Sequence, residues 1–127
     1  MTYGISKEVA TGYDETVLKV TEELKKEGFG VLTTIDIRDT LKKKLNVDFP
    51  RYVILGACNP PFAHRALQAE EQIGLLLPCN VIVYEKGTKT IVSAFDPMAM
   101  TKLVDNPAIG GLAAEVKGRL ERVIAAL

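Results

Sequence analysis

Cys58, Asn59 and Pro60 form the segment of this sequence with the clearest chemical potential. Asn often caps a helix, and Pro is favoured at the first helical position. Cys58 is therefore expected where a strand ends and a helix begins. The unpaired N–H groups and positive dipole end of such a helix favour an anion or a thiolate. This placement makes Cys58 a candidate nucleophile, with a small buried apolar side chain as the alternative.

A second Cys-Asn pair, Cys79 and Asn80, directly follows Pro78. Both pairs stand at the ends of apolar segments, so they can meet in the folded chain. Two thiols and two amides would then form a pocket for a small ligand. A zinc ion would need His64 and a carboxylate beside Cys58 and Cys79, although standard zinc motifs use more closely spaced pairs of cysteines.

Two further residues have side chains suited to acid–base chemistry or ligand binding. His64 is the single histidine and lies about one and a half turns into the helix that follows Cys58. It could activate that thiol as a base, with an exposed histidine that has no partner as the alternative. Asp96 precedes Pro97 and could be a general base or a ligand, but the role of a helix cap is sufficient to explain it.

Hydrophobic periodicity, caps and turn residues predict the elements that would position these side chains. Strands are expected at 3–10, 30–35, 52–57, 81–85 and 90–95, and 73–77 is expected to be a short apolar connection, with a strand as the alternative. Helices are expected at 11–28, 36–46, 59–70 and 107–127. The strands at 81–85 and 90–95 are expected to form a hairpin, and because the strands of a hairpin are antiparallel, this argues against a purely parallel sheet. We therefore predict one compact α+β domain over residues 1–127, with a mostly antiparallel sheet and helices packed on one face.

Several local expectations follow from particular residues. Thr11 is expected to cap the first helix, whose apolar stripe comprises Val17, Leu18, Val20 and Leu24. The run at 52–57 is almost continuously apolar, which predicts a central strand buried on both faces. Gly110 and Gly111 weaken the first turn of the last helix, so its regular part is expected to begin near Leu112.

Composition narrows the range of partners. The chain has 127 residues, of which 47% are apolar, and its 16 basic and 16 acidic residues give no net charge. Nucleic acid and anionic membranes are disfavoured because they attract a basic excess, and the basic run at 42–44 is read as a solvated helix face. No segment has the length of a spanning helix or the pattern of a signal peptide, so we expect a cytoplasmic protein with two free cysteines.

The segments at 56–67 and 74–85, with their Cys-Asn-Pro and Pro-Cys-Asn motifs, resemble the family called domain of unknown function 302. The segments at 28–32 and 35–37 also match its pattern, so the resemblance covers nearly the whole chain. It implies a small bacterial or archaeal α+β domain with a fold like that of the TATA-binding protein, in which the two motifs are hallmarks. It implies no activity, and the neutral charge gives no reason to expect nucleic-acid binding with that fold.

Three functions remain open, and we rank a binding domain first because a clear acid–base pair is lacking. It would hold a small molecule or metal ion at Cys58, Asn59, Cys79 and Asn80, with Asp96 as a further ligand. A thiol enzyme would use Cys58 as nucleophile or redox centre, His64 as base and Cys79 as resolving thiol. An assembly domain would form a homodimer through the C-terminal helix and the leucines at 75–77.

Overall fold

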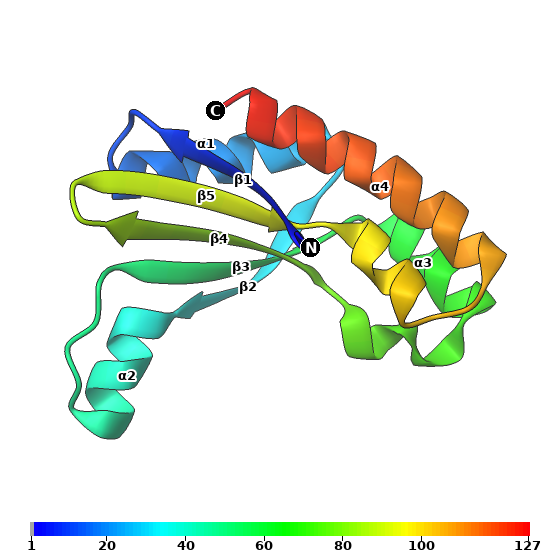
Figure 1. The fold of residues 1–127 in the computed structure, drawn as a ribbon, viewed down its shortest axis with the longest axis horizontal. Helices are drawn as coiled ribbons and strands as arrows, with labels where there is room; N and C mark the ends of the chain where they lie inside the picture. Colours follow the sequence, from blue (N-terminus) through cyan, green and yellow to red (C-terminus); the bar gives the residue numbers. More distant parts are fainter. Residues whose placement is uncertain (1) are drawn as a thin grey trace.

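The computed structural model describes residues 2–127. Five strands and four α-helices, with two short 3₁₀ helices, follow one another along the chain (Figure 1). Their bounds are β1 Gly4–Val9, α1 Tyr13–Lys26, β2 Gly30–Asp36, α2 Ile37–Leu45, β3 Tyr52–Cys58, α3 Pro60–Ala69, η1 Glu71–Leu76, β4 Cys79–Lys86, β5 Lys89–Phe95, η2 Pro97–Lys102 and α4 Pro107–Ala125.

All five strands form one antiparallel sheet in the order β1-β5-β4-β3-β2. The predicted α+β domain with an antiparallel sheet is confirmed. β4 and β5 form the expected hairpin, and Gly87 adopts a φ of 63° in its turn, a conformation that glycine takes without steric cost. β4 is the middle strand, so both of its edges are hydrogen-bonded to neighbouring strands.

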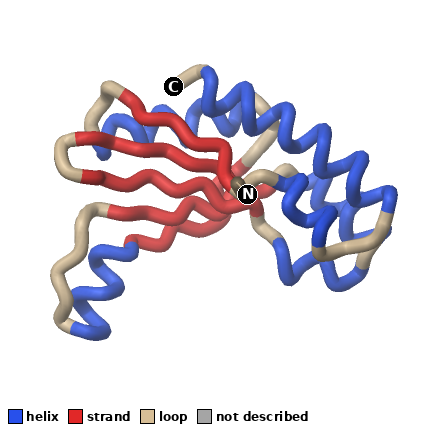
Figure 2. The backbone as a smooth tube through the Cα atoms, viewed as in Figure 1, coloured by secondary structure: helices blue, strands red, loops and turns tan. Residues whose placement is uncertain are grey.

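The main core lies between α1, α4 and one face of the sheet. Val20 and Leu24 of α1 meet Leu120 of α4 and alternate residues of β3, β4 and β5 in a single apolar cluster. A second, smaller cluster comprises Ile73, Met100 and Ile109, and it joins η1, η2 and the start of α4. Figure 2 shows that much of the helical structure lies beyond one end of the strands, and this smaller cluster belongs to that end.

Several predicted caps and stripes are confirmed and others are wrong. The carboxylate of Asp36 accepts a hydrogen bond from Asp39 N at 2.9 Å, as expected for the cap of α2. Thr11 does not cap α1, because its hydroxyl bonds instead to the hydroxyl of Thr16 at 2.6 Å and α1 begins after Gly12. Leu18 is 67% exposed, so it does not belong to the buried stripe of α1.

The strand considered as an alternative at 73–77 is wrong, because this connecting segment belongs to the 3₁₀ helix η1 and its exit. Ile73 N donates to Glu70 O and Leu77 N donates to Gly74 O, so the backbone turns instead of extending. The late start predicted for the last helix is also wrong, since α4 begins at Pro107. Asn106 caps it by accepting from Ala108 N, and this cap together with buried Ile109 outweighs the two glycines.

α2 stands away from the other helices at the outer end of β2 and β3 (Figure 1). None of its residues is buried, and Leu45 at the end of its apolar stripe is 65% exposed. Within residues 2–127, every helix is too short or too polar to cross a bilayer.

Candidate functional site

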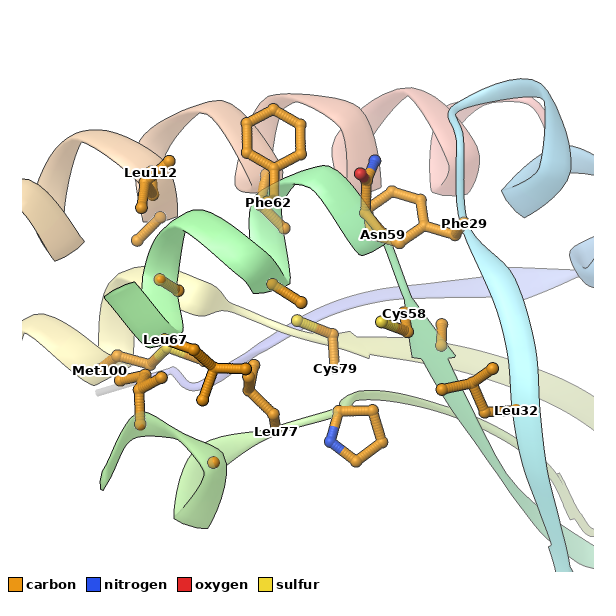
Figure 3. Close-up of a pocket in the computed structure, with 18 of the residues that line it drawn as sticks. Phe29, Leu32, Cys58, Asn59, Phe62, Leu67, Leu77, Cys79, Met100 and Leu112 are labelled. Atoms are coloured by element: carbon orange, nitrogen blue, oxygen red, sulfur yellow. The ribbon is translucent and has the colours of Figure 1, made fainter. Parts of the chain in front are cut away.

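A cavity of about 390 Å³ lies where the two apolar clusters meet, at the helical end of the sheet (Figure 3). Its walls come from α3, α4 and η1, and from the ends of β3 and β4. Among residues 2–127, none that lines it is charged, and its polar lining consists of Thr33, Cys58, Asn59 and Cys79. The structure therefore brings together three of the residues that the sequence proposed as a ligand site.

The other proposed site residues lie elsewhere. Asn80 is exposed, because it alternates with Cys79 along β4 and points away from the core. His64 is exposed on α3 and does not line the cavity. The carboxylate of Asp96 caps η2 by accepting from Met98 N at 2.9 Å and forms an ion pair with Lys117, also at 2.9 Å.

The proposed zinc site is not assembled in the part of the chain that the structure describes. Among residues 2–127, no three His, Cys, Asp or Glu side chains are grouped so that they could hold a metal ion. Of the proposed protein ligands, the cavity brings together Cys58 and Cys79, whereas His64 lies outside it.

The two thiols have different environments within the cavity. Cys79 faces Ala57 across the β3–β4 ladder and is buried. Burial, and secondarily the proximity of Cys58, raises the pKa of the Cys79 thiol to about 11. Cys79 is therefore protonated at neutral pH and contributes a small apolar surface. Cys58 is only partly buried, so it is the more accessible of the two thiols.

The start of α3 offers fewer hydrogen-bond donors than the sequence suggested. Pro60 and Pro61 occupy the first two helical positions and have no N–H groups. Ala63 N already donates to Asn59 O at 2.9 Å. The prediction that free N–H groups gather beside Cys58 is therefore weakened by the two prolines that make the helix start recognisable.

Asn59 precedes α3, but its side chain makes no capping hydrogen bond. Its Nδ2 instead donates to Glu27 O at 3.4 Å, and Arg119 Nη1 donates to the same oxygen at 3.0 Å. Gly28 has a φ of 87°, and a Cβ there would lie 3.0 Å from Asn59 Nδ2. Asn59 thus joins the end of α1 to the start of α3, and Gly28 leaves space for this contact.

Gly56 permits the close approach of three segments beside the cavity. A Cβ at this position would collide with Thr33 Oγ1 of β2 and would lie 3.0 Å from Pro78 Cγ. Two residues further on, β3 ends at Cys58. The absence of a side chain at position 56 therefore lets β2 and the Pro78 turn close around the strand that carries the thiol.

The family model for the domain of unknown function DUF302 matches residues 5–127. The chain belongs to the DUF302 family. Its structure is similar to the crystal structure of an uncharacterized conserved DUF302 protein from Bacillus stearothermophilus, with 32% sequence identity and a TM-score of 0.92. The match covers 98% of each chain. No curated protein matches this sequence.

Sequence reasoning did not identify several residues that shape the cavity of this DUF302 domain. Phe62 of α3 is buried, and the guanidinium carbons of Arg65 and Arg119 lie 4.6 and 5.2 Å from its ring centroid. Leu32 lines the cavity although it is 68% exposed, so it marks the opening of the cavity to solvent. Leu67, which helical spacing predicted to face inward with Ala63 and Ala66, also lines the cavity and is 43% exposed. An exposed leucine has no distinctive local pattern, whereas the only aromatic residue of α3 was a signal that could have been used.

Proposed function

We propose that this DUF302 domain binds a small, uncharged and mainly apolar molecule in the cavity between α3, α4 and the sheet. The observation that carries the proposal is a cavity of about 390 Å³ without a charged lining residue. This volume lies within the range of roughly 300–1,000 Å³ that is typical of small-molecule sites. An ionised ligand would lose its hydration on entering this cavity and would meet no lining residue of opposite charge, so its binding would be unfavourable.

The thiols support binding more than catalysis. At neutral pH the raised pKa of Cys79 keeps this thiol protonated, so it is a poor resolving nucleophile. His64 lies outside the cavity lining, so the proposed Cys58–His64 pair has no support from the arrangement of the site. We assign to Cys58 and Asn59 the role of the polar groups that orient a ligand against otherwise apolar walls.

Fluorescence titration tests the proposal with two probes of nearly the same skeleton. Neutral phenylnaphthylamine should bind and gain emission, and its anionic sulfonate analogue, anilinonaphthalene sulfonate, should bind at least about tenfold more weakly because no cation lines the cavity. Equal binding of both probes would contradict the proposed ligand class. No binding of the neutral probe up to its solubility limit would refute the proposal itself.

A pair of identical substitutions tests whether the probe occupies this cavity. Ala66→Phe places a ring at a half-buried lining position of α3, whereas Ala114→Phe places the same ring on the exposed face of α4. Ala66→Phe should weaken binding at least tenfold and Ala114→Phe should leave it unchanged. Unchanged binding by folded Ala66→Phe protein would place the probe somewhere else.

A further inference from the structure

The sheet has a second face that the helices do not cover. Val53 and Leu55 of β3 point into the main core, and the alternate residue Ile54 points to the other side. Ile54 and Ile82 belong to neither apolar cluster. In Figure 2 no helix lies across the five strands on the side turned to the viewer. The prediction that residues 52–57 are buried on both faces therefore holds for one face only within a single chain.

This uncovered face is apolar over its centre. The strand register places three isoleucines from β2, β3 and β4 in one row, namely Ile35, Ile54 and Ile82. The adjacent row contains the stacked rings of Tyr52 and Tyr84, whose centroids are 5.3 Å apart, followed by Ile91. The first charged side chain in these two rows is Glu8 on the outermost strand β1. The Glu8 carboxylate forms an ion pair with Lys89.

An antiparallel sheet with one solvated face normally alternates apolar and polar residues. Here both faces of β3 and β4 are apolar over the middle of the strands, with Asn80 and Lys86 at the two ends of the outer face of β4, and an apolar centre on both sides is the pattern of a sheet covered on both sides. The exposed apolar surface continues into the segment beside α2, where Leu45, Val47 and Phe49 are 65%, 45% and 39% exposed. This face therefore has the composition of a buried surface, although none of the helices of the chain covers it.

We propose that a second copy of this chain covers this face, so that two sheets pack face to face around a two-fold axis. Because the centre of the face lacks charge, it meets its own copy without like-charge repulsion. Five strands about 4.8 Å apart, each rising about 3.3 Å per residue over six residues, give a flat footprint of about 500 Å². The exposed side chains beside α2 extend this area towards the roughly 800 Å² per partner that a stable interface buries.

The middle of the face identifies the residue closest to the axis. β4 is the central strand, and Ile82 lies midway along it on the uncovered face. In a two-fold arrangement centred there, Ile82 of one copy lies near Ile82 of the other. The C-terminal helix, which the sequence suggested as the interface, has its apolar stripe buried in its own core instead.

Light scattering after size exclusion tests the proposal on the full chain. Wild-type protein at about 100 μM should have twice the 13.9 kDa mass of one chain. Ile82→Lys should yield monomers, whereas Leu18→Lys, at a residue that is 67% exposed on α1, should leave the dimer intact. Circular dichroism establishes that each variant is folded. Ile82→Thr, which retains a β-branched side chain, should weaken association at least tenfold if the lysine variant does not fold.

A charge-pairing experiment distinguishes this interface from others. Ile82→Lys and Ile82→Glu should each be monomeric alone and should form a heterodimer when mixed, because the two new charges would meet near the axis. A monomeric wild type, a dimeric Ile82→Lys variant, or failure of the mixture to associate would overturn the proposal. Dissociation by Leu75→Lys, at an 82% exposed leucine of η1, with no effect of Ile82→Lys, would place the interface at η1 and would also overturn it.

Discussion

Replacing Gly56 by Ala tests how tightly β3 is held beside the cavity. The new methyl group would collide with Thr33 Oγ1 on one side and would lie 3.0 Å from Pro78 Cγ on the other. Neither contact leaves space for a methyl group, so the Thr33 side chain must rotate, or β2 or the Pro78 turn must move. Overpacking of this kind costs about 1–3 kcal/mol, and we expect the upper part of that range because the methyl group is confined on two sides.

The assay is urea unfolding at 25 °C, with Gly30→Ala as the matched control. Gly30 also lies in a strand of this sheet, but a Cβ there meets nothing within 4 Å. Gly30→Ala should be neutral, or stabilising by about 0.4–1 kcal/mol through loss of chain entropy in the unfolded state. Gly56→Ala should lower the urea midpoint by about 1 M, since the slope of the free energy with urea is about 1–3 kcal/mol per M.

A double-mutant cycle identifies the responsible contact. Thr33→Ala removes the hydroxyl that the new methyl group would meet, but leaves Pro78 in place. The double variant should therefore recover about 1–2 kcal/mol relative to the sum of the single effects. A Gly56→Ala cost below about 0.5 kcal/mol, or no coupling with position 33, would show that the three segments are not packed as the structure indicates.

Three further perturbations test the surroundings of the cavity. Thiol labelling near neutral pH, read by mass spectrometry, should modify Cys58 before Cys79. The rise in the pKa of Cys79 from 9.0 to about 11 lowers its thiolate fraction about 100-fold. Rapid labelling of Cys79 in the folded protein would therefore contradict its burial. The hydrogen bond from Arg122 lowers the pKa of Glu27 below its ordinary value of 4.5, so its stabilisation is present above that pH and is lost as the pH falls through the lowered pKa. Urea unfolding should therefore find Glu27→Gln less stable than wild type at pH 7, and this difference should shrink as the pH is lowered and Glu27 becomes protonated; equal stability at pH 7 would argue against the pair. Phe62→Ala should cost about 3–5 kcal/mol in the same assay, and a cost below about 1 kcal/mol would show that this ring is not part of the core.

Local signals predicted the fold better than they predicted the site. Asp36 caps α2 and Gly87 closes the hairpin because each depends on neighbours close in sequence, which a sequence displays directly. Asn59 satisfied the same local rule, but its amide bonds to Glu27 O, more than thirty residues away in the chain. A tertiary hydrogen bond competes with a local cap, and the outcome depends on how close the end of α1 lies to the start of α3 in space, which no local pattern records.

The candidate site shows the same division. Cys58 and Cys79 reach one cavity because β3 and β4 are neighbours in the sheet. The sequence indicated that the two Cys-Asn pairs could meet, but it did not indicate that these two strands pair. Helical spacing placed His64 on the polar side of α3, and the structure confirms that it is exposed. Phe62, two positions earlier, takes the inward side because its ring packs into the main core, and this orientation leaves His64 exposed.

The two proposals use different parts of the same strand, and this makes them separable. Residues 53, 55 and 57 of β3 point to the core, and Ala57 also lines the cavity, whereas Ile54 points to the uncovered face. Ile82→Lys should therefore abolish the dimer without changing the affinity for phenylnaphthylamine, and Ala66→Phe should weaken probe binding at least tenfold without changing the mass in solution. If Ile82→Lys removed both properties in a folded protein, the cavity would depend on the second copy, and the independence of the two sheet faces argued above would be incorrect.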